Sequence, residues 1–267
     1  MPSYVIIGAS RGIGYQFLRS LSRNPSNTVV ATARDPTSTL EKVSNDKLSN
    51  VHVLAADLTD AASLSAAADE TSKLTGGVVD YLIINGAYVS QATATQSPTA
   101  FAGQESLWVS DLTTSIATNV TGTLYSINAF LPLVRASSIK KIVVTSSGMA
   151  DTDLILTSGA AGGVPYTLSK AAVNALVAKY AAEFEDTGIV IIALSPGLVL
   201  TSWDSLEDPQ AKAMYGFLDK WFKRYEPNFK GPILPEESVD MQLKVIEKVT
   251  TKDSGKFLSH REDGRWI

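Results

Sequence analysis

Several residue types are missing or scarce in this 267-residue chain. It has no cysteine, which excludes disulfides, thiolate nucleophiles and cysteine-ligated zinc. Its two histidines are His52 and His260, so a histidine-based metal site or a Ser-His-Asp triad would need one of them. His52 lies in the apolar run 51–55, where it is best explained as a strand residue. We therefore expect no metal site.

Positive charge and long apolar runs are scarce as well. The net charge is −4 and the pI about 5.3, so the chain has no basic field that would attract nucleic acid or an anionic membrane. The longest apolar run, residues 189–194, is too short to span a bilayer. The first residues enter a strand pattern without a basic region or cleavage site typical of a signal peptide. We expect a soluble, cytoplasmic protein with neither nucleic-acid nor membrane partners.

Short Val- and Ile-rich runs alternate with helical patterns along the chain. Hydrophobic residues make up 45% and charged residues 19%, an ordinary globular composition, and residues 1–267 fit one domain. Near-continuous apolar strands between helices predict a Rossmann-type, doubly wound α/β fold, with a mainly parallel sheet flanked by helices on both faces. The predicted strands are 4–7, 28–32, 51–55, 81–84, 141–145 and 190–194, and the predicted helices are 13–23, 61–75, 107–134 and 166–185.

Three irregular stretches, 88–106, 148–165 and 196–236, follow predicted strands. In doubly wound folds ligands bind beyond the carboxyl ends of the strands, so we expect these stretches to wall a substrate cleft. The third holds an aromatic helix between prolines, which either packs against the body or a partner subunit, or forms a lid over substrate. The apolar residues expected at the cleft are Leu154, Ile155, Leu156, Trp203, Met214, Tyr215 and Phe217.

Gly8, Gly12 and Gly14 stand between the first strand and the first helix. Glycines allow a tight turn and a close approach of the backbone to a pyrophosphate, and the following helix offers unpaired N–H groups. The alternative is a plain strand-to-helix turn. The context favours a phosphate-binding loop, although the spacing is Gly-xxx-Gly-x-Gly rather than Gly-x-Gly-xx-Gly.

The end of the second strand carries both a cation and an anion, Arg34 and Asp35. A carboxylate there would bind an adenosine ribose, whereas an arginine would meet a 2′-phosphate. Asp35 precedes Pro36 and is expected to start a turn, and Arg11 adds a second cation, so we favour NADP(H) over NAD(H). Asp57, after the third strand, can reach the adenine amino group or cap the next helix.

Tyr166 and Lys170 lie one helical turn apart. Positions i and i+4 share a helix face, so the lysine charge can favour ionisation of the phenol. Alone, this spacing is common in surface and packing pairs. A tyrosine has a pKa near 10, and proton transfer near neutral pH requires it to be lowered by roughly two units. We expect Lys170, together with the oxidised nicotinamide, to lower the pKa of Tyr166.

With the glycine loop, Tyr166-xxx-Lys170 and Pro196-Gly197 in order, nearly the whole chain resembles the short-chain dehydrogenase/reductases. Asn85 matches the last asparagine of the family's Asn-Asn-Ala-Gly, although the first is lost here. The long interval before Tyr166, the Thr-Ala-Arg-Asp after the second strand and the closing Asp-Gly-Arg-Trp are similar to the carbonyl reductases that include the sniffer and C-factor proteins.

The resemblance implies a catalytic tetrad of Asn119, Ser147, Tyr166 and Lys170, with Ser146 as the alternative serine. In it, Tyr166 is the acid, Ser147 holds the substrate oxygen, Lys170 activates Tyr166 and binds a cofactor ribose, and Asn119 supports a proton relay. It also implies that Thr201 and the backbone of Val199 bind the nicotinamide. The expected NADP(H) site comprises Gly8, Ser10, Arg11, Gly12, Ile13, Gly14, Arg34, Asp57, Leu58, Asn85, Gly86, Tyr166, Lys170, Pro196, Gly197, Val199 and Thr201.

These patterns favour an NADPH-dependent reductase of a ketone or aldehyde, acting on a small apolar or aromatic molecule. Oxidation of a secondary alcohol with NADP is the alternative, because the same site runs both ways. A non-catalytic nucleotide sensor would have no reason to keep the tetrad. The family resemblance further implies a homodimer formed through the helices 107–134 and 166–185, with a tetramer as the alternative.

Overall fold

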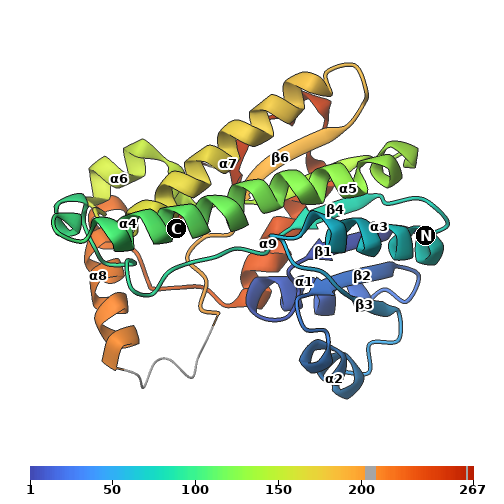
Figure 1. Ribbon diagram of the computed structural model, residues 1–267, viewed down its shortest axis with the longest axis horizontal. Coiled ribbons are helices and arrows are strands. Elements are labelled where there is room, and N and C mark those ends of the chain that lie inside the picture. Colours follow the sequence, from blue (N-terminus) through green and yellow to red (C-terminus); the bar gives the residue numbers. More distant parts are fainter. Residues whose placement is uncertain (202–208, 263) are drawn as a thin grey trace.

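The structure is a computed structural model that describes residues 1–201, 209–262 and 264–267, of which 209–215 are described by their backbone (Figure 1). Within these residues the strands form one parallel sheet in the order β3-β2-β1-β4-β5-β6-β7. This confirms the predicted α/β fold. The strands are β1 (Ser3–Ile7), β2 (Thr28–Ala33), β3 (Val51–Ala55), β4 (Tyr81–Ile84), β5 (Lys141–Thr145), β6 (Val190–Ser195) and β7 (Phe257–Ser259).

Central strands are buried on both faces, as their apolar runs predicted. Every residue of β6 is buried. In β1, Val5 and Ile7 belong to one core cluster and Ile6 to the other, because successive side chains of a strand point to opposite faces. The sheet therefore separates two cores.

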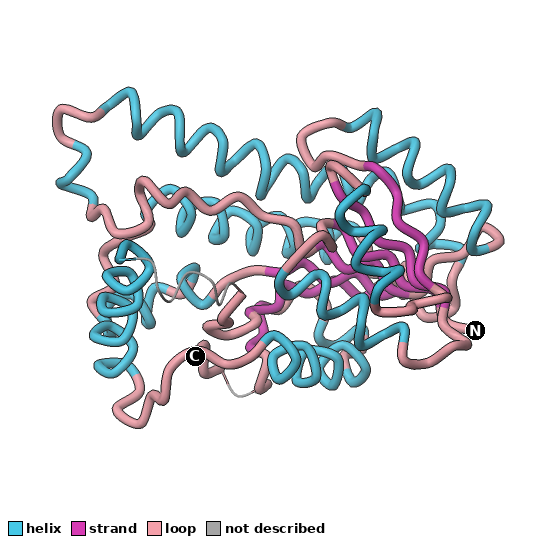
Figure 2. The backbone as a smooth tube through the Cα atoms, turned by 90° about the horizontal axis from the view of Figure 1, so that it is seen from below, coloured by secondary structure: helices cyan, strands magenta, loops and turns pink. Residues whose placement is uncertain are grey.

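Helices cover both faces of the sheet, which Figure 2 shows as strands between two helical layers. Buried side chains of α3, α5 and α7 fill the first core, and those of α1 and α9 fill the second. Their bounds are α1 (Gly12–Ser22), α3 (Ala61–Thr75), α5 (Gly122–Ala136), α7 (Val164–Glu183) and α9 (Pro235–Lys248).

The predicted helix 107–134 is helical but not uniform. It consists of α4 (Glu105–Ser115) and α5, joined by a π-helical turn, Ile116–Thr121. The remaining helices are peripheral: α2 (Thr37–Asn45) follows β2, whereas α6 (Thr152–Ser158) and α8 (Pro209–Tyr225) lie together at the opposite end (Figure 1). No helix in the described part of the chain is long and apolar enough to cross a membrane.

The strand order reverses between β1 and β4, and such a switch point is where doubly wound sheets bind ligands. The glycine loop follows β1, and the irregular stretches follow β4, β5 and β6. All four segments therefore meet at the carboxyl edge of the sheet.

Candidate active site

The glycine loop is shaped by close backbone contacts. Gly8 and Gly12 have φ values of +84° and +57°, in the left-handed region that favours glycine. A Cβ on Gly8 would lie 2.4 Å from the Cα of Gly86, and one on Gly14 would lie 2.2 Å from the Gly8 carbonyl oxygen. No side chain caps the start of α1 at Arg11, so its first N–H groups stay available to an anion.

Asn85 joins the glycine loop to the neighbouring strand. Its Nδ2 donates to the carbonyl of Gly8 at 3.2 Å, and its Oδ1 accepts from the Thr145 hydroxyl at 3.4 Å. Beside it, a Cβ on Gly86 would lie 2.6 Å from Leu58 Cδ1. The altered Ile84-Asn85-Gly86 segment therefore keeps the contact between the end of β4 and the glycine loop.

Tyr166, Lys170 and Ser147 come together where α7 crosses the end of β5. The hydroxyl of Tyr166 is hydrogen-bonded to Ser147. Lys170 is 3% exposed, its Nζ donates to the carbonyl of Thr145 at 2.7 Å, and the same nitrogen lies 5.8 Å from the centroid of the Tyr166 ring. The helical spacing thus brings acid, serine and ammonium together, with Lys170 buried and Tyr166 and Ser147 half-buried.

The expected lowering of the Tyr166 pKa is wrong for the protein alone. Burial raises the pKa of Tyr166, and the hydrogen bond with Ser147 opposes that rise only in part. Burial also lowers the pKa of Lys170 to about 8. Both changes have the same cause, because a poorly solvated site disfavours the charged form of either group.

The structure distinguishes the two adjacent serines. Ser146 is 1% exposed and its hydroxyl donates to Oδ1 of Asn174 at 2.6 Å. Ser147 instead caps a short 3-10 turn, accepting from the N–H of Met149 at 3.2 Å, and bonds Tyr166. Ser146 is therefore held in a structural contact, and Ser147 remains the candidate for binding substrate.

Asn174 is a site residue that sequence reasoning missed. It stands two turns after Tyr166 and one after Lys170, on the same face of α7. Tyr166, Lys170 and Asn174 reach the consecutive residues 147, 145 and 146. The i, i+4, i+8 spacing was visible in the sequence, but the partner of Asn174 was not.

Asn119 is fixed within the π-helical turn between α4 and α5. Its Oδ1 accepts from the N–H of Tyr88 at 2.7 Å, and its Nδ2 donates to the Tyr88 carbonyl at 3.0 Å and to the Ser169 hydroxyl at 2.9 Å. Ser169 in turn donates to the carbonyl of Tyr166 at 2.7 Å. Asn119 is thus linked to the backbone of Tyr166, and π-helical turns frequently occur at functional sites.

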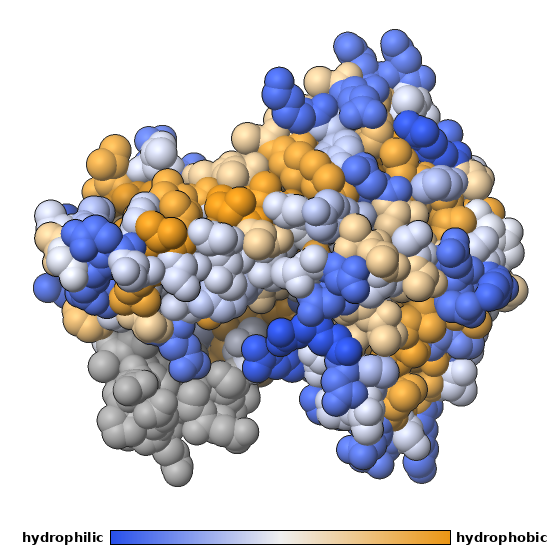
Figure 3. Space-filling view, in the orientation of Figure 1, coloured by the Kyte–Doolittle hydropathy of each residue, from blue (hydrophilic) through white to orange (hydrophobic). Residues whose placement is uncertain are grey.

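Cations are exposed at the other end of the glycine loop. Arg11 and Arg34 both reach solvent, and Figure 3 shows strongly hydrophilic side chains over the start of α1 at the margin of a hollow. Asp35 accepts from the N–H of Thr37 at 2.9 Å, the turn expected from the sequence. The Asp35 carboxylate is thus engaged in this turn, and Arg34 forms no ion pair with it.

Asp57 lies partly buried after β3. Its Oδ1 accepts from the N–H of Thr59 at 2.8 Å and from that residue's hydroxyl at 2.8 Å, while Asp60 is the residue that caps α3. The Thr59 N–H and the nearby Arg34 charge both lower the pKa of Asp57, although partial burial opposes them. Of the two sequence interpretations, helix capping is wrong, and contact with adenine stays a prediction.

The segment after β6 turns back over the glycine loop. Gly197 has φ +83°, and a Cβ there would lie 2.7 Å from the His260 ring. Thr201 has its Cγ2 atom 3.2 Å from the position of a Cβ on Gly12. Val199 pairs with Ile233 in a short parallel bridge, with the Leu200 N–H donating to Ile233 at 3.0 Å. Thr201 therefore lies beside the glycine loop, and nicotinamide binding by Thr201 and the backbone of Val199 stays a prediction.

The apolar wall predicted at residues 154–156 is wrong for Leu154. Asp151 accepts from the N–H of Leu154 at 2.7 Å and caps α6, and the leucine packs against Phe222 and Trp266. Leu156, by contrast, is 78% exposed. The short helix α6 thus packs Leu154 into a small core and exposes Leu156 to solvent.

The aromatic helix α8 packs against the body through part of its surface. Phe222 is buried in the small core, which confirms packing at that residue, whereas Phe217 is 48% exposed. The lid stays a prediction. Trp203 and the side chains of Met214 and Tyr215 lie outside the described residues.

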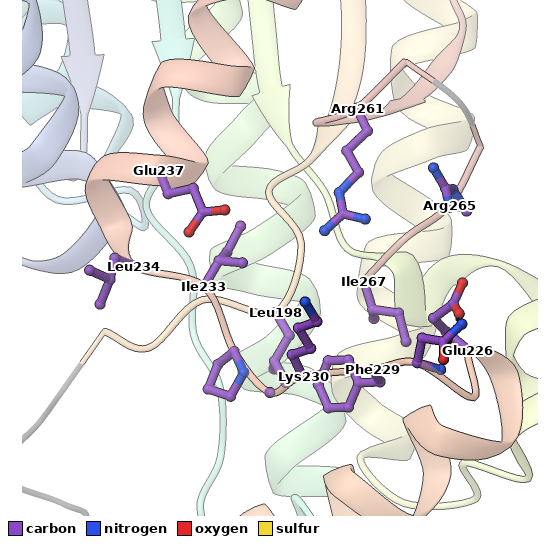
Figure 4. A pocket seen from close by; sticks show the side chains of 13 residues that line it. Leu198, Glu226, Phe229, Lys230, Ile233, Leu234, Glu237, Arg261, Arg265 and Ile267 are labelled. Atoms are coloured by element: carbon purple, nitrogen blue, oxygen red, sulfur yellow. Dashed lines mark hydrogen bonds between the residues drawn. The ribbon is translucent and has the colours of Figure 1, made fainter.

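Two hollows are found in the described part of the chain, and neither is lined by Asn119, Ser147, Tyr166 or Lys170. One of about 550 Å³ adjoins Leu198 and the start of α9, with Glu237, Arg261 and Lys230 around it (Figure 4). A smaller one of about 330 Å³ is lined mainly by apolar side chains beside α4 and the start of α7, namely Pro98, Phe101, Glu105, Trp108 and Val164. The smaller one is therefore the nearer to Tyr166 along α7.

A family model for short chain dehydrogenases matches residues 3–211. The chain belongs to this family. This short-chain dehydrogenase is 37% identical to the short chain dehydrogenase virK of Hypocrea virens and 39% identical to the dehydrogenase/reductase AacuF of Aspergillus aculeatus, in each case over the full length of both chains. Enzymes of this family are oxidoreductases that use nicotinamide cofactors.

Solved structures agree with this assignment. An NADPH-bound carbonyl reductase from chicken fatty liver is 26% identical, with a TM-score of 0.77 over 98% of this dehydrogenase and 97% of that chain. The carbonyl reductase Sniffer of D. melanogaster has a TM-score of 0.75 at 20% identity, covering 98% of this dehydrogenase, and shares the fold. The resemblance predicted from the motifs is confirmed at the level of family and fold.

Proposed function

We propose that this dehydrogenase reduces the carbonyl group of a ketone or aldehyde, with NADPH as the hydride donor and Tyr166 as the proton donor. The hydrogen-bonded pair of Tyr166 and Ser147 carries this proposal, because it joins an acid to a second hydroxyl at the carboxyl edge of the sheet. Two such groups can hold one carbonyl oxygen while it becomes an alcohol.

The residues of the site fit a dinucleotide. The backbone contacts of Gly8 and Gly14 leave no room for side chains, and the uncapped start of α1 suits a pyrophosphate. Arg11 and Arg34 are exposed cations suited to a 2′-phosphate, which supports NADP(H) over NAD(H). When bound, the cofactor supplies the hydride.

Proton handling falls to the side chains around Tyr166. With its pKa raised by burial, Tyr166 is protonated near neutral pH and can donate. Ser147 binds the same oxygen and orients it. Lys170 stabilises the tyrosinate left after transfer and contacts a cofactor ribose, while Asn119, bonded to the Tyr88 backbone and Ser169, supports the path by which a proton returns.

The raised pKa of Tyr166 keeps it protonated near neutral pH, the form that reduction needs. Oxidation of a secondary alcohol needs Tyr166 to accept a proton, hence to be ionised first. The exposed apolar side chains of Leu156 on α6 and Phe217 on α8 suit a small apolar or aromatic substrate.

The protein is proposed to form a homodimer through α4 and α7, on which Val109 and Leu168 are exposed apolar residues. It is also proposed to act in the cytoplasm.

Tyr166→Phe tests the mechanism. We expect it to abolish turnover of a ketone and aldehyde panel, followed by NADPH absorbance, while NADPH binding measured by fluorescence is retained. Tyr180→Phe is the matched control, since Tyr180 lies on the same helix and its hydroxyl donates to Asn128 at 2.7 Å. If Tyr166→Phe kept most of its activity, Tyr166 would not be the acid.

A further inference from the structure

Lys42 reaches the glycine loop from a helix that the sequence did not predict. Its Nζ donates to the carbonyl of Ser10 at 3.0 Å, and lies 5.6 Å from the centroid of the Tyr15 ring on α1. Ser10 is the residue before Arg11. One turn of α2 thus brings a third cation to the loop that carries Arg11.

None of the three cations is ion-paired within the described part of the chain. Arg11, Arg34 and Lys42 are exposed, and none lies within ion-pair distance of a carboxylate of the described residues. Asp35, next to Arg34 in sequence, accepts from the N–H of Thr37, and Asp57 is near enough to Arg34 for the arginine charge to lower its pKa. An exposed cation outside an ion pair can attract an added anion.

Asp46, the acid at the C-terminal end of α2, also contacts other side chains. Asp46 accepts from the Tyr15 hydroxyl at 2.9 Å and lies 3.4 Å from Arg19. Lys42 therefore forms no ion pair with Asp46, although Asp46 is one turn away. Since an ammonium has three donors and Ser10 takes one, two remain for a ligand.

We infer that Lys42 is a ligand of the 2′-phosphate of NADP(H), acting with Arg11 and Arg34, and helps to select this cofactor over NAD(H). The inference rests on the proposed use of NADPH. A 2′-phosphate supplies the negative charge that would pair with these three cations. A lysine binds phosphate as a point charge. Anchored on Ser10, Lys42 holds its charge in place before the cofactor arrives.

The test is cofactor binding, measured by calorimetric titration of Lys42→Ala with NADPH and with NADH. We expect the NADPH dissociation constant to rise about tenfold, as for the loss of one charge-assisted contact. NADH binding stays within about twofold, and Lys42→Arg restores most of the NADPH affinity. Lys179→Ala, an exposed lysine of α7, is the control and changes neither constant.

Two results would overturn the inference. An equal loss for both cofactors would mean that Lys42 only supports the Ser10 turn, and no loss for either would mean that it does not act at all. Wild-type protein that binds NADH as tightly as NADPH would instead refute the proposed cofactor preference itself. Circular dichroism of each variant confirms that the fold is kept.

Discussion

The two halves of the site differ in the burial and hydrogen bonding of their polar and charged side chains. At the glycine loop, Arg11, Arg34 and Lys42 are exposed and unpaired among the described residues. Around Tyr166, Lys170 and Asn119 are buried and bonded within the protein. One half is incomplete until an anion binds, whereas the other is preorganised. Substitutions in the first should change cofactor affinity, and those in the second should change turnover.

Lys170→Met should have the largest effect. Removing the buried charge that stabilises ionised Tyr166 is expected to lower kcat by about 10²- to 10⁴-fold, the usual range for a lost acid–base component. Lys179→Met is the control on the same helix. Turnover is measured by NADPH absorbance at saturating cofactor; a loss confined to the KM for NADPH would break the division between the two halves.

Gly14→Ala should act on the binding half. The new Cβ would lie 2.2 Å from the Gly8 carbonyl oxygen, so the loop must shift. We expect the NADPH dissociation constant to rise about tenfold or more, and stability to fall by about 1–3 kcal/mol, as for overpacking. Gly216→Ala, with no atom within 4 Å of the added group, is the helical control. Unchanged NADPH binding would show that the loop tolerates displacement.

Asn174→Ala should have a smaller effect, on turnover alone. It removes the acceptor of the buried Ser146 hydroxyl and loosens the residue next to Ser147. We expect kcat to fall several-fold, corresponding to about 1 kcal/mol for one neutral hydrogen bond, with NADPH binding unchanged. Asn128→Ala, which loses a similar bond to Tyr180, is the control. A matching loss in both variants would indicate general loosening.

The pH dependence of stability gives the subtlest test. The pKa of Lys170 is about 8 in the folded protein against 10.5 ordinarily, so between these values the unfolded chain binds more protons. Stability contributed by this group therefore rises with pH from about 8 towards 10.5. Urea midpoints of the wild type relative to Lys170→Met should show this rise, and parallel curves would contradict the burial of the charge.

Elements with strong local patterns were predictable. Strands 51–55, 81–84 and 141–145 and helix 61–75 have the predicted bounds, because their apolar runs or capping signals lie within the segment itself. The glycine loop followed from its glycine spacing and context, and the approach of Tyr166 to Ser147 was implied by the family resemblance, although the roles of these residues remain proposals.

Features that depend on distant partners were not predictable. The short helix α6 depends on capping by Asp151 and on burial of Leu154 among residues far along the chain. Strand β7 has only three residues, paired with β6. The contacts of Lys42 and Asn174 likewise join segments that no local pattern connects. The raised pKa of Tyr166 depends on its burial, which spacing alone does not reveal.

The bridge between Val199 and Ile233 makes the intervening segment an exchangeable unit. Its two ends are fastened to each other by backbone hydrogen bonds, Leu200 to Ile233 and Ile233 to Leu198, which do not depend on side-chain identity. Replacing what lies between them with the equivalent segment of a relative should transfer substrate preference while Tyr166 stays where it is. An exchange that transfers substrate preference in this way would show that substrate choice can change independently of proton transfer.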